Sequence, residues 1–179
     1  MISSKKKILA ISGSTKQQSL NLALLKAIAA TYSDRITVDL YDGIDKMPHF
    51  NPDKDNETPP ESVVDFRNRI TESDGVIICT PEYVFSLPGS LKNAIEWTVS
   101  TTIFSKKPVA LIVAAASGEK AVESLKLIMS TLDAVIPANG SLLIKGAKGK
   151  IGPNGVIADA KTDAKLNRLM DSFLRSLDE

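Results

Sequence analysis

Three segments of the chain consist almost entirely of apolar residues and predict buried strands. They are Lys7–Ile11, Gly75–Thr80 and Pro108–Ala115. Apolar and polar positions do not alternate along them, which is typical of parallel strands that are covered on both faces. Two further segments, Ile36–Tyr41 and the shorter Leu142–Lys145, complete a prediction of five strands.

Apolar residues between these strands recur at the spacing of a helix. The first such stripe follows Ser19, a residue type suited to the N-cap, and Pro88 suits the first turn of a later helix. A helix is also predicted over Ser62–Glu72. The stripes are formed by Leu20, Ala23, Leu24, Ala27 and Ile28; by Leu91, Ala94, Ile95 and Thr98; by Val122, Leu125, Ile128, Met129 and Leu132; and by Leu166, Leu169, Met170, Phe173, Leu174 and Leu177.

Strands and helices alternate along the chain, apart from two irregular stretches. Asp42–Pro60 is too rich in proline for a helix and is predicted to wrap the surface, and Pro153–Gly155 indicates the turn of a small hairpin. The alternation predicts an α/β fold with a parallel sheet and right-handed crossovers, but it leaves the strand order open. The 179 residues suit a single domain over residues 1–179.

The charge balance gives no sign of a nucleic-acid or membrane-surface partner, because 22 basic and 21 acidic residues leave a net charge of +1. No apolar stretch approaches the roughly 20 residues needed to span a bilayer. The apolar run after Lys5–Lys7 also ends too early for a signal peptide. We therefore expect a soluble cytoplasmic protein. Cys79 is the only cysteine, which excludes an intramolecular disulfide and a multi-cysteine metal site, and it is predicted to be a small buried hydrophobe.

Side chains suited to catalysis are scarce. The only histidine, His49, lies in the proline-rich stretch, so a His-based triad and a multi-histidine metal site are excluded. The chain also lacks the G-x-G-x-x-G, G-x-x-x-x-G-K-[ST] and G-x-S-x-G motifs. This composition favours a protein whose cofactor performs the chemistry, without a metal.

Two loops that follow predicted strands carry the most informative motifs. Residues 12–21 read SGSTKQQSLN, and hydroxyls and backbone N–H groups at the start of a helix favour a phosphate there. Residues 80–97 read TPEYVFSLPGSLKNAIEW. Together the loops resemble the NAD(P)H-dependent FMN reductase family, flavodoxin-like oxidoreductases that include quinone, azo-dye and chromate reductases. The family motifs read roughly G-S-x-R-x-x-S-x-N and P-E-Y-N-x-S-x-P-G-x-L-K-N-A-[IL]-[DE]-W.

The resemblance implies a flavodoxin-like three-layer sandwich with strand order 2-1-3-4-5 and a ligand at the carboxyl ends of strands one, three and four. It implies noncovalent FMN, with NADPH or NADH as co-substrate. Ser14, Ser19 and Asn21 would contact the FMN phosphate, aided by backbone N–H groups. Ser12 and Lys16 also fall on the motif, although Lys16 replaces an arginine and loses its bidentate fork.

The second and third loops would border the flavin. The resemblance assigns these positions to the isoalloxazine and ribityl chain: Pro81, Glu82, Tyr83, Val84, Phe85 and Ser86. Val84 stands where the family commonly has Asn. Tyr83 would stack at the flavin or face a partner subunit, and Glu82 would hold the loop by accepting backbone N–H bonds or act across a dimer interface.

In the third loop, Ser117 and Gly118 would touch the pyrimidine side of the flavin through backbone groups. Lys120 and Ala121 replace a glycine pair of the family, which bears on the nicotinamide contacts, and Glu119 is interpreted as a first-turn acid favoured by the helix dipole. Lys92, Asn93, Glu96 and Trp97 lie on a helix that relatives use in assembly, so their match is predicted to report a homodimer or a dimer of dimers.

The resulting prediction is an FMN-dependent NAD(P)H oxidoreductase that passes hydride from nicotinamide to FMN and then reduces a flavin, quinone, azo compound or similar small acceptor. No catalytic side chain is assigned, because the flavin carries the chemistry. Two alternatives stay open. One is a flavodoxin-type electron carrier, which the net charge of +1 disfavours because such carriers are usually strongly acidic. The other is a non-catalytic flavin-binding protein, which Val84 and Lys120-Ala121 favour.

Overall fold

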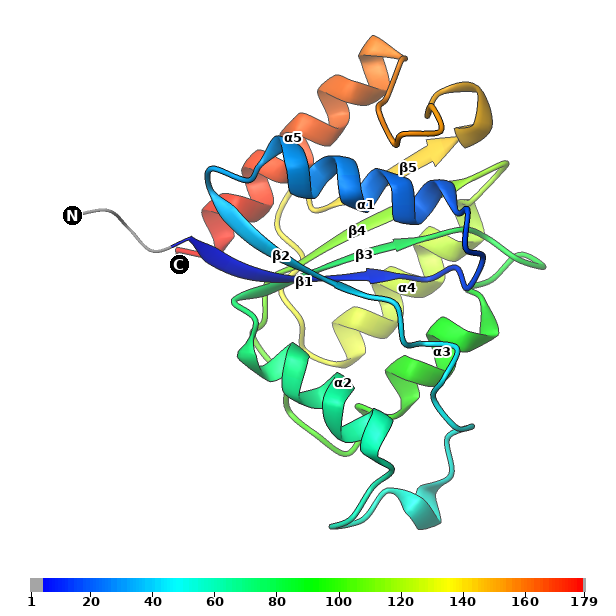
Figure 1. Cartoon of the computed structure of the whole chain (residues 1–179), viewed down its shortest axis with the longest axis vertical. Coiled ribbons are helices and arrows are strands. Elements are labelled where there is room, and N and C mark those ends of the chain that lie inside the picture. Colours follow the sequence, from blue (N-terminus) through cyan, green and yellow to red (C-terminus); the bar gives the residue numbers. More distant parts are fainter. Residues whose placement is uncertain (1–4, 179) are drawn as a thin grey trace.

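The computed structural model describes residues 5–178 and contains a parallel five-stranded sheet with helices on both faces (Figure 1). The strand order is β2-β1-β3-β4-β5, which confirms the order implied by the family resemblance. Each predicted strand is present with bounds within one residue of the prediction. The strands are β1 (Lys6–Ser12), β2 (Ile36–Tyr41), β3 (Gly75–Thr80), β4 (Val109–Ala115) and β5 (Ser141–Lys145).

Within residues 5–178 five α-helices cover the sheet, and each predicted stretch forms one, although the last residues of three stripes, Thr98, Leu132 and Leu177, lie just past the helix ends. Two of them, α1 and α5, lie on one face, and the other three lie on the opposite face (Figure 1). Ser19 is the N-cap of α1, as predicted, whereas Pro88 is the N-cap of α3 rather than part of its first turn. The helices are α1 (Leu20–Thr31), α2 (Glu61–Glu72), α3 (Gly89–Glu96), α4 (Glu119–Thr131) and α5 (Ala160–Ser176).

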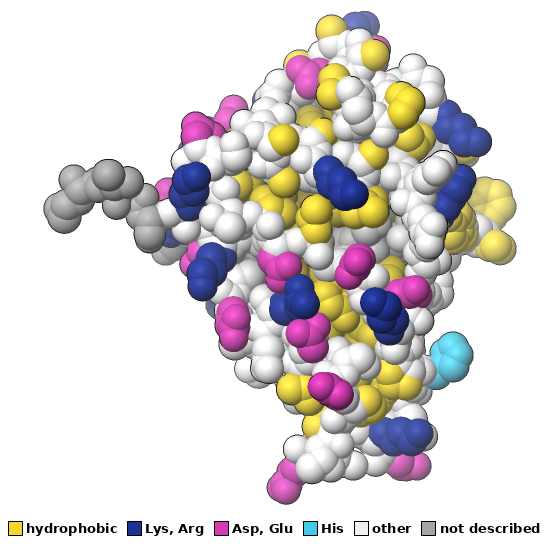
Figure 2. All heavy atoms as spheres, viewed as in Figure 1, with side chains coloured by type: hydrophobic (Ala, Val, Ile, Leu, Met, Phe, Trp, Pro, Cys, Tyr) yellow, Lys and Arg dark blue, Asp and Glu magenta, His cyan; other side chains and the backbone are white. Residues whose placement is uncertain are grey.

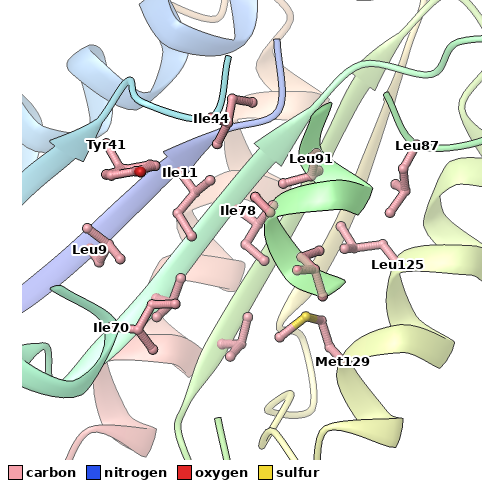
Figure 3. Close-up of a cluster of buried hydrophobic side chains, with 14 of the residues drawn as sticks. Leu9, Ile11, Tyr41, Ile44, Ile70, Ile78, Leu87, Leu91, Leu125 and Met129 are labelled. Carbon is pink, nitrogen blue, oxygen red and sulfur yellow. The ribbon is translucent and has the colours of Figure 1, made fainter. Parts of the chain in front are cut away.

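The central strands contribute side chains to two separate cores because successive residues of a strand point to opposite faces. Ile8 and Ala10 of β1 pack with α1 and α5, while Leu9 and Ile11 pack with α2, α3 and α4. Figure 3 shows the second core, where Leu91 of α3 and Leu125 of α4 meet the sheet. Burial on both faces explains why these strands read as uninterrupted apolar runs.

The proline-rich stretch after β2 wraps the surface, as predicted, with one short 3-10 turn at Pro52–Lys54. It is fastened to the end of α3. The Asn93 amide donates to Pro48 O at 2.9 Å, Asn93 Oδ1 accepts from Phe50 N at 2.7 Å, and Trp97 Nε1 donates to Pro48 O at 2.8 Å. Trp97 is fully buried in its own subunit. The prediction that Trp97 reports assembly was therefore wrong, because its ring and its N–H are committed within the chain.

The segment after β5 completes the fold with a short 3-10 turn at Ala147–Gly149 and a small hairpin. Ile151 and Ile157 form an antiparallel bridge, and Gly152 N and Gly155 N donate within the turn, which confirms the predicted hairpin. The hairpin rests on α1, since a Cβ at Gly155 would lie 2.0 Å from Ala23 O. Among residues 5–178 no helix is both long and apolar enough to cross a membrane.

Candidate functional site

The carboxyl ends of β1, β3, β4 and β5 lie at one edge of the sheet, and the segments that follow them enclose a cleft of about 590 Å³. In Figure 1 these segments meet at the right of the molecule. The volume lies within the range of about 300–1,000 Å³ typical of small-molecule sites. Seven of the residues assigned from the sequence line the cleft: Ser14, Lys16, Ser19, Asn21, Pro81, Glu82 and Tyr83.

Gly13 allows the first loop to turn close against β3. A Cβ at this position would lie 2.3 Å from Thr80 Oγ1, so only glycine fits without displacing the neighbouring strand. Gly13 N donates to Cys79 O at 2.8 Å and continues the pairing of β1 with β3 beyond the strand end. The close approach holds the first and second loops beside one another at the mouth of the cleft.

The first loop leaves donors free at the start of α1. Its side chains stabilise the turn locally, since Ser14 Oγ accepts from Lys16 N at 3.3 Å and Ser19 Oγ accepts from Asn21 N at 3.2 Å. The N–H groups of Gln17, Gln18 and Leu20 have no acceptor within residues 5–178. Unpaired N–H groups at the positive end of a helix dipole form an anion site.

The Asn21 side chain is turned inward. It is 4% exposed, its amide donates to Ala114 O at 3.5 Å, and its Oδ1 accepts from the Cys79 thiol at 3.2 Å. Asn21 thus joins α1 to β3 and β4 beneath the cleft. Cys79 is fully buried, as predicted, and burial raises the pKa of its thiol, so the thiol is neutral.

Glu82 bridges the second loop to the third. Its Oε1 accepts from Gly118 N at 2.9 Å, and its Oε2 accepts from Lys120 N and Ala121 N, both at 3.0 Å. The first of the two roles considered for Glu82, acceptance of backbone N–H bonds, is confirmed. The carboxylate caps α4, whose dipole favours a negative charge there. An anion cannot bind these three N–H groups while Glu82 holds them.

The second loop ends in a tight turn with a strained backbone. Tyr83 and Ser86 exchange two backbone hydrogen bonds of 3.0 Å, and the residues between them, Val84 and Phe85, have φ values of 50° and 55°. Asn adopts this left-handed region more readily than Val, so the Asn common in the family fits the turn better. Val84 is 95% exposed and Phe85 76% exposed, and Figure 2 shows hydrophobic atoms projecting at the right edge, where Figure 1 places this loop.

Several assigned residues lie beside the cleft and do not line it. They are Ser12, Val84, Phe85, Ser86, Ser117 and Gly118. Gly118 has a φ of 102°. Its N–H donates to the Glu82 carboxylate, and its carbonyl accepts from Val122 N. On this side the cleft is lined instead by the end of β4 and the first residue after it, namely Ala114, Ala115 and Ala116. Glu119 is in the first turn of α4, as interpreted, and also pairs with Lys145 at 2.7 Å.

Sequence reasoning missed the segment that follows β5. Gly146, Ala147, Lys148 and Gly149 line the cleft opposite the first loop. Lys148 brings a positive charge to the side where α1 begins. The predicted fifth strand could have indicated this segment, because the carboxyl ends of all strands in a parallel sheet lie at the same edge.

A parallel sheet of this order, with an open helix N-terminus where the strand order reverses, defines a flavodoxin-like α/β protein, a class whose ligand sites lie at the carboxyl ends of the strands. A family model for NADPH-dependent FMN reductase matches residues 6–149. The chain belongs to the NADPH-dependent FMN reductase family, and its cofactor is FMN.

Relatives along nearly the whole chain include enzymes that act on different acceptors. A 2-hydroxy-1,4-benzoquinone reductase from a Burkholderia species is 32% identical, and the match covers 93% of each chain. Subunit 2 of an NADH-dependent flavin reductase from Lactobacillus johnsonii is 31% identical over 97% of this chain and 98% of its own. Among solved structures, FerB, a flavoenzyme NAD(P)H:(acceptor) oxidoreductase from Paracoccus denitrificans, superposes with a TM-score of 0.77 at 27% identity, and 97% of each chain is covered.

Proposed function

We propose that this protein is an NAD(P)H-dependent oxidoreductase that binds FMN in the cleft at the ends of β1, β3 and β4 and reduces a small acceptor there. The chemistry that FMN supplies is acceptance of hydride from a reduced nicotinamide, followed by reduction of a flavin, quinone, azo compound or similar molecule. The protein contributes binding, orientation and electrostatics. Family membership and the open helix N-terminus of α1 support this proposal.

The single observation that carries it is the contrast between two helix N-termini at the cleft. Gln17 and Gln18, which precede the N-cap, and Leu20, the first residue of α1, have unpaired N–H groups, while the N-terminus of α4 is occupied by the Glu82 carboxylate. A phosphate therefore fits at α1, with Ser14, Ser19 and Lys16 beside it. Asn21 would support this loop from below through its bonds to Ala114 and Cys79.

Pro81, Tyr83 and the three alanines at the carboxyl end of β4 are proposed to border the flavin ring. They line the cleft away from the phosphate loop, and they offer apolar surface and backbone groups. Val84, Phe85, Ser86, Ser117 and Gly118 would approach from the rim. The small acceptor would enter the same cleft after the nicotinamide leaves.

The assembly, location and extent of the functional unit are proposals too. We infer a homodimer or a dimer of dimers, which the exposed apolar side chains of Val84 and Phe85 support. A cytoplasmic location is proposed as well. Residues 1–179 are proposed to act as one domain, since one sheet carries every element of the site.

The test is anaerobic titration of the protein, reconstituted with FMN, by NADPH and separately by NADH, with the flavin absorbance followed. We expect at least one nucleotide to bleach the flavin, and a quinone to restore the colour. Steady-state rates with the quinone should give parallel double-reciprocal lines, because two substrates use one cleft in turn.

The alternatives give different results. Bleaching by dithionite but by neither nucleotide excludes the reductase, and transfer of these electrons to an added acceptor then identifies an electron carrier. A flavin that only dithionite reduces, and that passes electrons to no added acceptor, points to a non-catalytic flavin-binding protein. A protein that does not bind FMN in calorimetry contradicts the proposal as a whole.

A further inference from the structure

A second groove of about 650 Å³ continues from the cleft along α1. The two share residues at their junction, namely Gln18, Ser19, Leu20 and Lys148. This junction is the phosphate end of the cleft, where the free N–H groups of the first loop lie. A ligand that extends beyond the FMN phosphate would therefore continue into this groove.

One wall of the groove is a face of α1. Ser19, Leu22, Ala23 and Lys26 line it at positions i, i+3, i+4 and i+7, which lie on one side of a helix. At a rise of 1.5 Å per residue, the seven steps from Ser19 to Lys26 span about 10 Å. This is of the order of the length of a nucleoside monophosphate.

The opposite wall is the segment after β5, drawn in yellow-orange above α1 in Figure 1. It provides Lys148, Ile151, Pro153 and Asn154. The close contact of Gly155 with the α1 backbone at Ala23 holds this wall against the helix. The groove thus has apolar surface on both sides, suited to a planar ring, with amide side chains at its edges.

The charge in the groove favours an anion. Its lining contains Lys26 and Lys148 and no acidic residue. Neither ammonium group forms an ion pair with a carboxylate in the part of the chain that the structure describes. Lys148 stands at the junction and Lys26 farther along α1, so both can meet a phosphate or a ribose near the helix.

We propose that this groove binds the adenosine monophosphate half of a flavin dinucleotide, so that the protein accepts FAD as well as FMN. The proposal rests on the proposed function, because it places the FMN half of the ligand in the cleft. A nicotinamide dinucleotide fits the groove less well, since its nicotinamide must reach the opposite end of the cleft, near Tyr83 and Ala116.

The test is calorimetric titration of the apoprotein with FMN, FAD and NADP⁺, in the wild type and in two charge reversals. Lys26→Glu changes a groove residue that does not line the cleft. Lys126→Glu is the matched control, an exposed lysine on α4, on the opposite face of the sheet. We expect FAD to bind the wild type within about tenfold of FMN. Lys26→Glu should weaken FAD by about tenfold or more while FMN changes less than about threefold. Lys126→Glu should affect neither.

Three results overturn the proposal. If FAD binds more than about a hundredfold more weakly than FMN, the groove does not admit the adenosine half. If Lys26→Glu leaves FAD affinity unchanged, the adenosine half lies elsewhere. If Lys26→Glu weakens only NADP⁺, the groove belongs to the nicotinamide nucleotide. FMN binding in each of these cases leaves the proposed function intact, whereas failure to bind either flavin removes both.

Discussion

Val84 is a β-branched residue in the left-handed region, where most L residues are disfavoured by about 1–2 kcal/mol. Its side chain is almost fully exposed, so packing within the subunit does not compensate for the strain. Asn tolerates this conformation better. We expect Val84→Asn to raise the free energy of unfolding by about 0.5–1 kcal/mol, measured by urea denaturation.

Val99→Asn is the matched control, because Val99 is also exposed but its φ is not positive. This variant should change stability by less than about 0.5 kcal/mol. Equal effects of the two substitutions would mean that the gain at Val84 comes from replacing an exposed apolar side chain with a polar one and that its backbone carries no strain.

The Cys79 thiol gives a pH dependence whose sign follows from burial. Burial raises its pKa above the ordinary value of 9.0, so the folded protein keeps a proton that the unfolded chain releases. The stability that the neutral thiol contributes is complete below that value and is lost as the pH rises through it. Each pH unit above it costs up to about 1.4 kcal/mol.

Cys79→Ser lacks this titration and serves as the reference. Between about pH 8 and about pH 10 we expect the wild type to lose about 1 kcal/mol more unfolding free energy than Cys79→Ser. Turnover of the variant at neutral pH should be nearly unchanged, because the hydroxyl can still donate to Asn21 Oδ1. Identical pH profiles for the two proteins would show that the thiol is accessible to water.

At the scale of elements, the strands and helices that could be predicted are those with a clear local pattern of apolar residues. The runs that form β1, β3 and β4 and the stripe of α5 are visible in the sequence, because each is buried along its whole length. The contacts that join elements are not visible. Trp97 meets Pro48 across 49 residues, and Glu82 meets the start of α4 across 36–39 residues. No periodicity encodes such pairs, and the family motif contained Trp97 without indicating its role.

Glu82 joins two elements, and its removal should affect both. Glu82→Gln keeps one acceptor oxygen but loses the charge and places an amide against backbone donors. We expect a loss of about 1–2 kcal/mol in unfolding free energy. Affinities for FMN and riboflavin should fall by similar factors, because Glu82 lies outside the phosphate loop.

Glu119→Gln is the control on the same helix. Its partner Lys145 is largely exposed, and surface pairs contribute little, so we expect at most about 0.5 kcal/mol. If the two variants behave alike in melting and in flavin titration, the Glu82 carboxylate does not hold the cleft wall.

The contact between α3 and the stretch after β2 should respond to Trp97→Phe. Phenylalanine keeps most of the ring but removes the N–H that donates to Pro48 O. Pro48 O keeps the Asn93 amide as a donor, so the loss is that of one hydrogen bond, about 0.5–1.5 kcal/mol. We expect residues 42–60 to exchange amide hydrogens faster in the variant, as measured by mass spectrometry. Lys92→Ala, on the exposed side of α3, should leave this exchange unchanged, and faster exchange there as well would show that the whole of α3 is loosened.

At the scale of the whole molecule, the order of strands decides which loops share the cleft. Alternation of strands and helices predicted the class, and the family motif added the order. Lys148 was missed because β5 is short and the motifs end before it, although its carboxyl end reaches the same edge. Asn21 was assigned to the phosphate on its motif position, while its buried contacts with Ala114 and Cys79 could be seen only once β3 and β4 were in place.

Assembly is also a property of the whole molecule, and it can be tested at the exposed tip of the second loop, which consists of Val84 and Phe85. Phe85 is 76% exposed beside Val84, an apolar pair that association with a second copy would cover. We expect the wild type to be a dimer or a dimer of dimers at micromolar concentration in sedimentation velocity. Burying one aromatic side chain contributes about 1.5–3 kcal/mol, so Phe85→Ser should raise the dissociation constant about tenfold or more. Val156→Ser removes an exposed side chain from the hairpin on α1 and should leave the constant unchanged. A monomeric wild type, or equal weakening by both substitutions, would show that the tip is not part of a subunit interface.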